Sequence, residues 1–90
     1  MRAAIIGTGG IAQVHAPLIR TQPNTKLVAI TDKDQTRAKS FASELKAERY
    51  YTDAEVMIRE MKPDIVHVLI PPKYYAELSI IYGNSFFMFL

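Results

Sequence analysis

The strongest constraint on the fold of this 90-residue chain is a glycine-rich turn close to its start. Residues 2–6 have the apolar composition of a short buried strand, and the turn Gly7-Thr8-Gly9-Gly10-Ile11-Ala12 follows at once. Apolar residues at helical spacing come directly afterwards, which predicts a helix that begins near Gly10. A strand, a turn of this type and a helix form the first part of a βαβ unit that binds a dinucleotide.

Each small residue of the turn has a physical role in such a unit. Gly7 allows the chain to turn sharply off the strand, and Gly9 lets the backbone approach a pyrophosphate closely. Ala12 stands at the third small position, where it allows the helix to pack tightly on the sheet. The helix N-terminus presents unpaired N–H groups and its positive dipole end to the anion. We therefore assign all six residues of the turn to cofactor binding, against the alternative of a tight turn without a ligand.

An acidic residue, Asp32, closes the second predicted strand. Its carboxylate can accept hydrogen bonds from the ribose hydroxyls of adenosine, and it would repel a 2′-phosphate, so NAD is preferred over NADP. Lys33, which we add to the cofactor-binding residues, and Arg37 can soften this preference, because cations pair with phosphate. The alternative role for Asp32 is helix entry, but Asp34 is at least as well placed to cap that helix.

Predicted strands and helices alternate along the rest of the chain. The first helix carries apolar residues and one histidine at the spacing of a sheet-facing stripe, namely Ile11, Val14, His15, Leu18 and Ile19. After a strand over residues 26–31, the helix capped by Asp34 has the apolar stripe Ala38, Phe41, Ala42 and Leu45. A short strand at Tyr50 and Tyr51 leads to a helix that Asp53 caps and that carries Val56, Met57 and Met61.

The clearest strand of the chain covers residues 65–70. Its unbroken run of largely β-branched residues predicts burial on both faces and a central place in the sheet. Pro71-Pro72 end it, a helix follows over about residues 74–82 with Gly83 as its stop, and residues 86–90 form a fifth strand or an exposed apolar end. The sequence therefore predicts an α/β fold of Rossmann type, a three-layer α/β/α domain over residues 1–90 with a mostly parallel sheet of four or five strands.

Composition excludes several other classes of function. Cysteine is absent, which excludes disulfides and thiolate metal sites and suits the cytoplasm. The formal net charge of +2 is small and scattered, so we expect neither nucleic acid nor a membrane surface as a partner. The apolar segments at both ends are too short for a signal core or a membrane span. His15 and His67 lie on different elements without a carboxylate cluster, so we expect structural roles for both and no metal site.

The ordered series of motifs resembles the N-terminal domain of the glucose–fructose oxidoreductase / inositol dehydrogenase (Gfo/Idh/MocA) family. The resemblance rests on residues 4–12, Leu27-Val28-Ala29-Ile30-Thr31-Asp32, Tyr51-Thr52-Asp53, Lys62-Pro63-Asp64-Ile65-Val66, and Pro71-Pro72 with Ala76-Glu77-Leu78. It implies an oxidoreductase domain that serves hydride transfer between NAD(P) and a sugar, polyol or related alcohol. The family's cofactor roles carry over to the glycine-rich turn, to Asp32, and to Ile70, Pro71, Pro72 and Tyr75.

The chain also departs from the family. Ile70 stands where a small polar residue is frequent, and Tyr75 stands where a histidine is common. The Glu-Lys-Pro motif after the family's fifth strand, whose lysine assists proton transfer, is absent, and so is the second domain that contacts substrate. We therefore assign no catalytic residue and expect a domain truncated at its C-terminal end, which binds NAD (NADP being possible) and does not catalyse alone.

Two other functions are left open by the residues, and so is the question of whether the chain is an enzyme. One is a non-catalytic NAD-binding sensor or subunit of a larger assembly. The other is a truncated reading frame without a function of its own. In either case the apolar segment after residue 85, if exposed, favours self-association.

Overall fold

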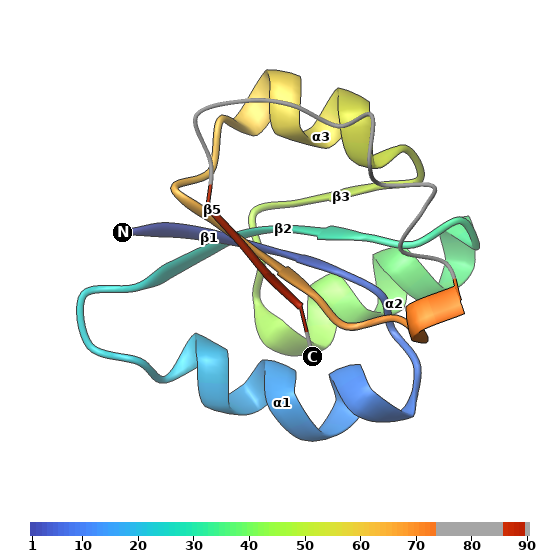
Figure 1. Ribbon diagram of the computed structural model, residues 1–90, viewed down its shortest axis with the longest axis horizontal. Helices are drawn as coiled ribbons and strands as arrows, with labels where there is room; N and C mark the ends of the chain where they lie inside the picture. Colours follow the sequence, from blue (N-terminus) through green and yellow to red (C-terminus); the bar gives the residue numbers. More distant parts are fainter. Residues whose placement is uncertain (74–85, 90) are drawn as a thin grey trace.

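In the computed structural model, which describes residues 1–73 and 86–89, parallel strands form one sheet with helices on both faces (Figure 1). The elements in chain order are β1 (Arg2–Ile6), α1 (Gly10–Arg20), β2 (Lys26–Thr31), α2 (Gln35–Leu45), β3 (Arg49–Tyr51), α3 (Ala54–Met61), β4 (Ile65–Val68) and β5 (Phe86–Phe89). The strand order is β3-β2-β1-β4-β5. The predicted Rossmann-type α/β fold and its fifth strand are confirmed, whereas the helix expected over 74–82, with Tyr75, lies outside the described residues.

The strand in the middle of the sheet is β1, not β4. β1 pairs with β2 on one side and with β4 on the other, and residues 3–6 are buried. β4 lies one place from the edge, and its Ile65 and His67 are only half-buried. The prediction of a central place for this strand was therefore wrong. A β-branched run indicates an interior strand, but it does not distinguish the middle strand from its neighbour.

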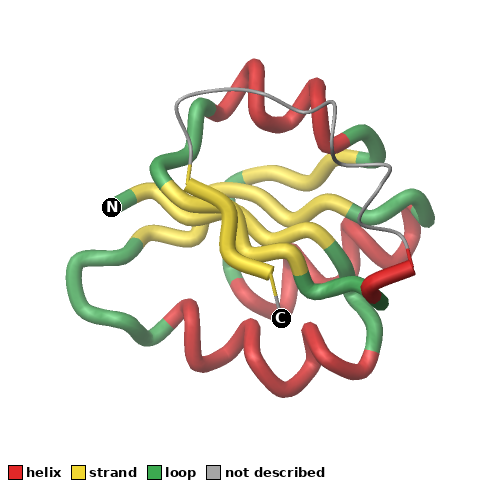
Figure 2. Tube along the Cα trace, in the orientation of Figure 1, coloured by secondary structure: helices red, strands yellow, loops and turns green. Residues whose placement is uncertain are grey.

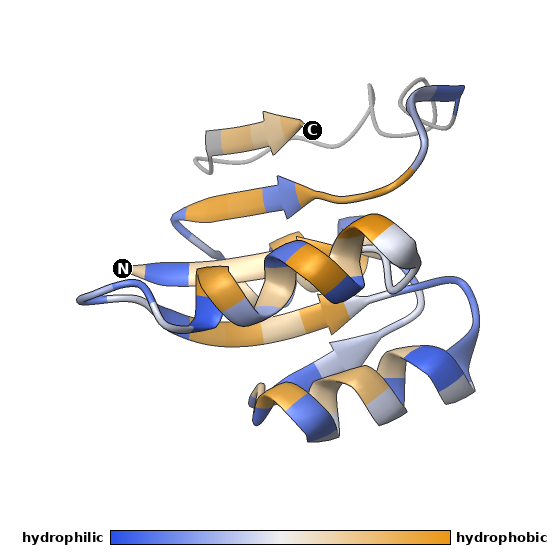
Figure 3. Cartoon of the chain, turned by 90° about the horizontal axis from the view of Figure 1, so that it is seen from below, coloured by the Kyte–Doolittle hydropathy of each residue, from blue (hydrophilic) through white to orange (hydrophobic). Residues whose placement is uncertain are grey.

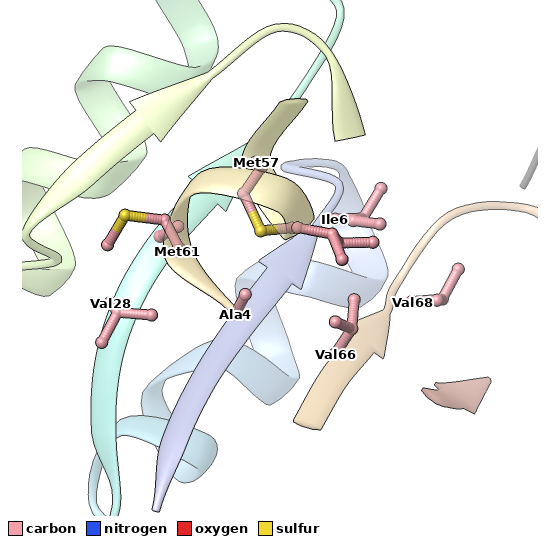
Figure 4. Close-up of a cluster of buried hydrophobic side chains, with 9 residues drawn as sticks. Ala4, Ile6, Val28, Met57, Met61, Val66 and Val68 are labelled. Atoms are coloured by element: carbon pink, nitrogen blue, oxygen red, sulfur yellow. The ribbon is translucent and has the colours of Figure 1, made fainter. Parts of the chain in front are cut away.

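Helices lie on both faces of the sheet (Figure 2), and two apolar clusters hold the three layers together. On one face, Met57 and Met61 of α3 pack against small and branched side chains of the sheet, which Figure 4 shows at Ala4, Ile6, Val28, Val66 and Val68. On the other face, α1 and α2 cover Ile5 and Ile30 of the sheet, and the predicted stripe of α2 is buried as expected. In α3 the stripe is confirmed at Met57 and Met61, and Ile58 joins it.

The sheet-facing side of α1 differs from the prediction. Ala12 and Ala16 face the sheet and are fully buried, while Val14 is 66% and Leu18 59% exposed. Ile11 is also exposed (39%), and only Ile19 of the expected apolar residues packs against the cluster, as a half-buried side chain. Small residues occupy the sheet-facing side of α1 because they let the helix approach the sheet closely beside the turn. Figure 3 looks onto the side of the sheet that α1 covers.

Aspartate side chains cap two of the helices, as predicted. Asp34 Oδ1 accepts a hydrogen bond from the backbone N–H of Arg37 at 3.2 Å, and Asp53 Oδ1 accepts one from Val56 at 3.1 Å. Each cap of this kind contributes about 1 kcal/mol. α1 has no such cap: its N-cap residue is Gly9, with no side-chain hydrogen bond to the first turn.

Candidate cofactor-binding cleft

A cleft of about 850 Å³ opens at the carboxyl ends of β1, β2 and β4. Parallel α/β sheets bind their ligands at this edge, where the strand order reverses beside the first strand. Nine of the twelve predicted cofactor residues line the cleft, namely Gly7, Thr8, Gly9, Gly10, Ile11, Asp32, Lys33, Ile70 and Pro71. Two of the other three do not line it: Ala12 is buried on the sheet-facing side of α1, and Pro72 is exposed to solvent. Tyr75 is not among the described residues.

Gly7 is required by the protein itself. Its φ of +113° lies in a region that side chains of L-residues rarely adopt. A Cβ at this position would collide with the backbone carbonyl of Leu69 and come within 2.8 Å of Ile70 Cγ2. The Gly7 N–H donates to the Thr31 carbonyl at 2.8 Å, so the turn is fixed between the ends of β2 and β4.

Gly9 and Gly10 are different, because the protein does not require either of them to be glycine. Gly9 has a φ of −79°, which any residue can adopt, and a Cβ there would meet only Arg37 Nη2, at 3.9 Å. A Cβ on Gly10 would meet nothing within 4 Å. Both residues line the cleft, so the space in front of them is open toward it. An open space against bare backbone is what close approach of a pyrophosphate needs.

The N-terminus of α1 is suited to an anion. The first turn of α1 has neither an acidic residue nor a side-chain cap, in contrast to the aspartate-capped α2 and α3. Its unpaired N–H groups and the positive end of the helix dipole favour negative charge at this place. The turn that leads into it is held from behind, because Gln13 Nε2 donates to the Thr8 carbonyl at 3.1 Å. These residues therefore fit the diphosphate of a dinucleotide.

Asp32 lies at the cleft with its carboxylate fixed by two donors. Thr8 Oγ1 donates to Asp32 Oδ2 at 2.7 Å, and the Asp34 N–H donates to Asp32 Oδ1 at 2.9 Å. A carboxylate oxygen has two lone pairs, so each oxygen keeps acceptor capacity for a further bond. A vicinal diol such as that of ribose can supply both of those donors. Since Asp34 caps α2, Asp32 is not needed as the cap.

Two cations line the cleft together with this carboxylate. Lys33 and Arg37 both line the cleft, and Arg37 reaches from the first turn of α2 toward Gly9. Positive charge here offsets part of the negative charge of Asp32 and of a bound phosphate.

Sequence reasoning missed a second wall of the cleft. Thr31, Leu69 and the segment Thr52, Asp53, Ala54 and Glu55 also line it. The signal for the segment was present, because Tyr51-Thr52-Asp53 ends a predicted strand and strand ends of a parallel sheet meet at one edge. Thr31 carries the same signal, because it is the last residue of the strand predicted over 26–31.

The histidines do not form a second site in the described part of the chain. Neither His15 nor His67 lines the cleft; both are half-buried, and burial lowers the pKa of His67 below its usual value of 6.5. Within residues 1–73 and 86–89, no three His, Cys, Asp or Glu side chains form a group that could hold a metal ion. The helices in this part of the chain include none of the length and apolar character needed to cross a membrane.

The chain is similar in sequence to two dehydrogenases. It is 32% identical over 81 residues to D-glucoside 3-dehydrogenase of Escherichia coli (strain K12), a match that covers 89% of the chain and 23% of the relative. It is 30% identical over 80 residues to myo-inositol 2-dehydrogenase of Thermotoga maritima, covering 89% of the chain and 24% of the relative. The chain thus spans about a quarter of the length of these curated relatives.

A solved dehydrogenase structure has the same fold as this chain, and a family model matches most of its sequence. The scyllo-inositol dehydrogenase of Lactobacillus casei, in a crystal structure with bound NAD(H) and scyllo-inositol, superimposes with a TM-score of 0.85 over 99% of the chain and 27% of that protein, at 22% identity. The model of an oxidoreductase family with an NAD-binding Rossmann fold matches residues 1–82. The chain therefore belongs to the Gfo/Idh/MocA family of oxidoreductases.

Proposed function

We propose that residues 1–90 act as one dinucleotide-binding unit that holds NAD for an oxidoreductase acting on CH–OH groups of sugars or polyols. The observation that carries this proposal is the uncapped, glycine-lined N-terminus of α1 beside Asp32, whose carboxylate Thr8 and the Asp34 N–H hold in place. The family match supports the cofactor. The glucoside and inositol dehydrogenases among the relatives support the substrate class.

Different parts of the cleft lining are chemically suited to different parts of the cofactor. The N–H groups at the start of α1 suit the pyrophosphate, and Asp32 suits the adenosine ribose. Leu69, Ile70 and Pro71, at the end of β4 on the other side of β1, leave an apolar wall for the nicotinamide half. Bound there, the nicotinamide supplies the hydride acceptor, and this chain's contribution is to hold and orient it.

Turnover needs more than this cleft provides. Oxidation of an alcohol requires a substrate held against the nicotinamide and a group that accepts the hydroxyl proton. The charged residues that line the described cleft are Asp32, Lys33, Arg37, Asp53 and Glu55, which come from the β2 and β3 side, away from the apolar wall at β4. We therefore propose that the chain binds cofactor without catalysing by itself.

The same observation favours a second candidate function. A cleft with an adenosine side rich in polar groups and an apolar nicotinamide side would also serve a non-catalytic NAD-binding sensor or subunit. Both candidates predict saturable NAD binding and no turnover by the chain alone, and they differ in whether the bound NAD serves oxidation of a substrate. Reduction of NAD in the presence of inositols or glucosides by the chain alone would contradict both.

Cofactor choice follows from the charges around the ribose. We propose that NAD binds more tightly than NADP, because the 2′-phosphate of NADP would lie against the Asp32 carboxylate. Lys33 and Arg37 limit the difference, since both are near enough to line the same cleft.

The test compares two aspartates that are two residues apart. Asp32→Asn and Asp34→Asn remove the same charge, but only Asp32 lines the cleft, and asparagine preserves the cap at position 34. In titration calorimetry, Asp32→Asn should weaken NAD binding by about tenfold or more and narrow the preference over NADP. Asp34→Asn should bind NAD like the wild type. Equal losses in both variants, or no saturable binding by the wild type, would contradict the proposed function.

A further inference from the structure

One polar group in the cleft has no hydrogen-bond partner among residues 1–73 and 86–89. It is the hydroxyl of Thr31, the last residue of β2, which is buried in a side chain that is 3% exposed. Thr8 makes a useful comparison, because it is equally buried (4% exposed) and its hydroxyl is satisfied by Asp32. A buried hydroxyl without a partner is unfavourable to the folded state, and its presence calls for a physical reason.

The position of Thr31 supplies that reason. The residue lines the cleft immediately before Asp32, and its backbone carbonyl accepts the hydrogen bond from the Gly7 turn. Ile30 packs in the cluster under α1 and α2, so the side chain of Thr31 alternates to the α3 side of the sheet. Thr52 and Asp53, which lead into α3, line the cleft on that same side.

We propose that the Thr31 hydroxyl hydrogen-bonds the adenosine half of the bound dinucleotide. This inference rests on the proposed function, and it deepens that function by naming a contact that the motif does not include. The adenosine half is the nearer one, because Asp32, the ribose acceptor, is the next residue along the chain, whereas the nicotinamide wall is formed at β4 on the far side of β1.

The chemistry of the side chain suits this contact. A hydroxyl both donates and accepts, so it can meet either a ring nitrogen or the exocyclic amine of adenine. The oxygen is covered in the structure, and a rotation about χ1, which exchanges the hydroxyl and the methyl group, is the smallest movement that turns it toward a ligand. The ligand would then satisfy a hydroxyl that the described residues leave unpaired.

The experiment uses two substitutions that separate the hydroxyl from the shape of the residue. Thr31→Val removes the hydroxyl and keeps the shape, whereas Thr31→Ser keeps the hydroxyl. Each protein is titrated with NAD and with ADP-ribose, which lacks the nicotinamide, and its melting temperature is measured without ligand. Thr31→Val should weaken both ligands by the same factor, about tenfold, while raising the melting temperature by roughly 4 °C. Thr31→Ser should retain the affinity of the wild type.

Opposite signs in binding and stability are the signature of a hydroxyl kept for a ligand, because a purely structural residue would lose both together. Thr21→Val, at the far end of α1, is the matched control and should leave both affinities unchanged. Unchanged binding in Thr31→Val, or a loss with NAD but not with ADP-ribose, would overturn the inference while leaving the proposed function intact. Absence of NAD binding by the wild type would overturn both. Thr31→Ala provides a second hydroxyl-free variant should the valine protein not fold.

Discussion

Thr8 Oγ1 donates a hydrogen bond to Asp32 Oδ2 at 2.7 Å and thereby joins the glycine-rich turn to the end of β2. The two residues are 24 positions apart in the chain. Their contact makes one unit of the two parts of the cleft that are suited to the pyrophosphate and to the ribose. Since the acceptor is a charged carboxylate, the bond is of the stronger kind. The carboxylate is therefore oriented before any ligand arrives.

Loss of this bond should weaken cofactor binding, although both of its partners belong to the protein. In Thr8→Val the carboxylate loses one of its two donors, so its orientation must be fixed at the moment of binding. We expect NAD affinity to fall by about tenfold and the free energy of unfolding by about 1–2 kcal/mol. Titration calorimetry and urea unfolding measure the two effects. Thr8→Ser, which keeps the hydroxyl, should behave like the wild type; equal losses in both variants would argue against orientation of Asp32.

The three glycines of the turn should respond differently to alanine. Gly7→Ala forces a side chain into a left-handed backbone and against Leu69, so the protein should lose at least about 2 kcal/mol of stability. Gly9→Ala and Gly10→Ala meet open space and should fold normally, but Gly9→Ala should bind NAD much more weakly because its methyl group occupies the approach of the pyrophosphate. Thermal unfolding and NAD titration of the three variants check this, and normal NAD binding by Gly9→Ala would be inconsistent with a diphosphate at the turn.

Stability should fall as the solution is acidified, partly through His67. Burial in β4 lowers the pKa of this side chain in the folded state below 6.5. As the pH drops below 6.5, His67 is protonated in the unfolded chain while it is still neutral in the folded chain. Protonation therefore favours the unfolded state. The melting temperature should therefore decrease between about pH 7 and about pH 5 by more in the wild type than in His67→Gln. Parallel curves for the two proteins would show that His67 does not contribute.

The edge strand β5 should promote self-association between copies of the chain. It stands at one end of the described sheet, its residues are Phe86-Phe87-Met88-Phe89, and Met88 and Phe89 are 53% and 48% exposed. Edge strands that stay single usually carry a charge or a proline, and β5 has neither. Sedimentation at increasing protein concentration should show association in the wild type and less of it in Met88→Lys. Val14→Lys places the same charge on the exposed side of α1; if it also prevents association, the contact is not at β5 alone.

The sequence predicted the order of the elements that the structure describes, the parallel sheet and both aspartate caps, because each depends on local pattern. It did not predict which side of α1 faces the sheet. Hydrophobicity favoured Ile11, Val14 and Leu18, whereas the structure buries Ala12 and Ala16. The distance between a helix and a sheet depends on the side chains of both elements. A small residue can therefore face the sheet in place of a larger apolar one. Hydrophobic periodicity within one element carries no information about that distance.

The cleft shows the same division between local and tertiary information. The motif predicted the glycine turn and Asp32 because the spacing of such residues follows from the shape of the βαβ unit. It could not predict that Thr8 holds Asp32, or that the hydroxyl of Thr31 lacks a partner in the part of the chain that the structure describes. Both facts depend on how side chains from separate strands meet, which is settled only when the sheet has formed.

The close packing of Gly7 against Leu69 affects how the domain can fold while it is being synthesised. β1 lies in the middle of the sheet, and its partner β4 is synthesised some sixty residues later, so β1 must wait for one of its two neighbours. A growing polypeptide cannot form the complete cleft until β4 has been synthesised, because the turn at Gly7 packs against the end of β4. Capture of the nucleotide during synthesis would thus require that β4 has already joined β1.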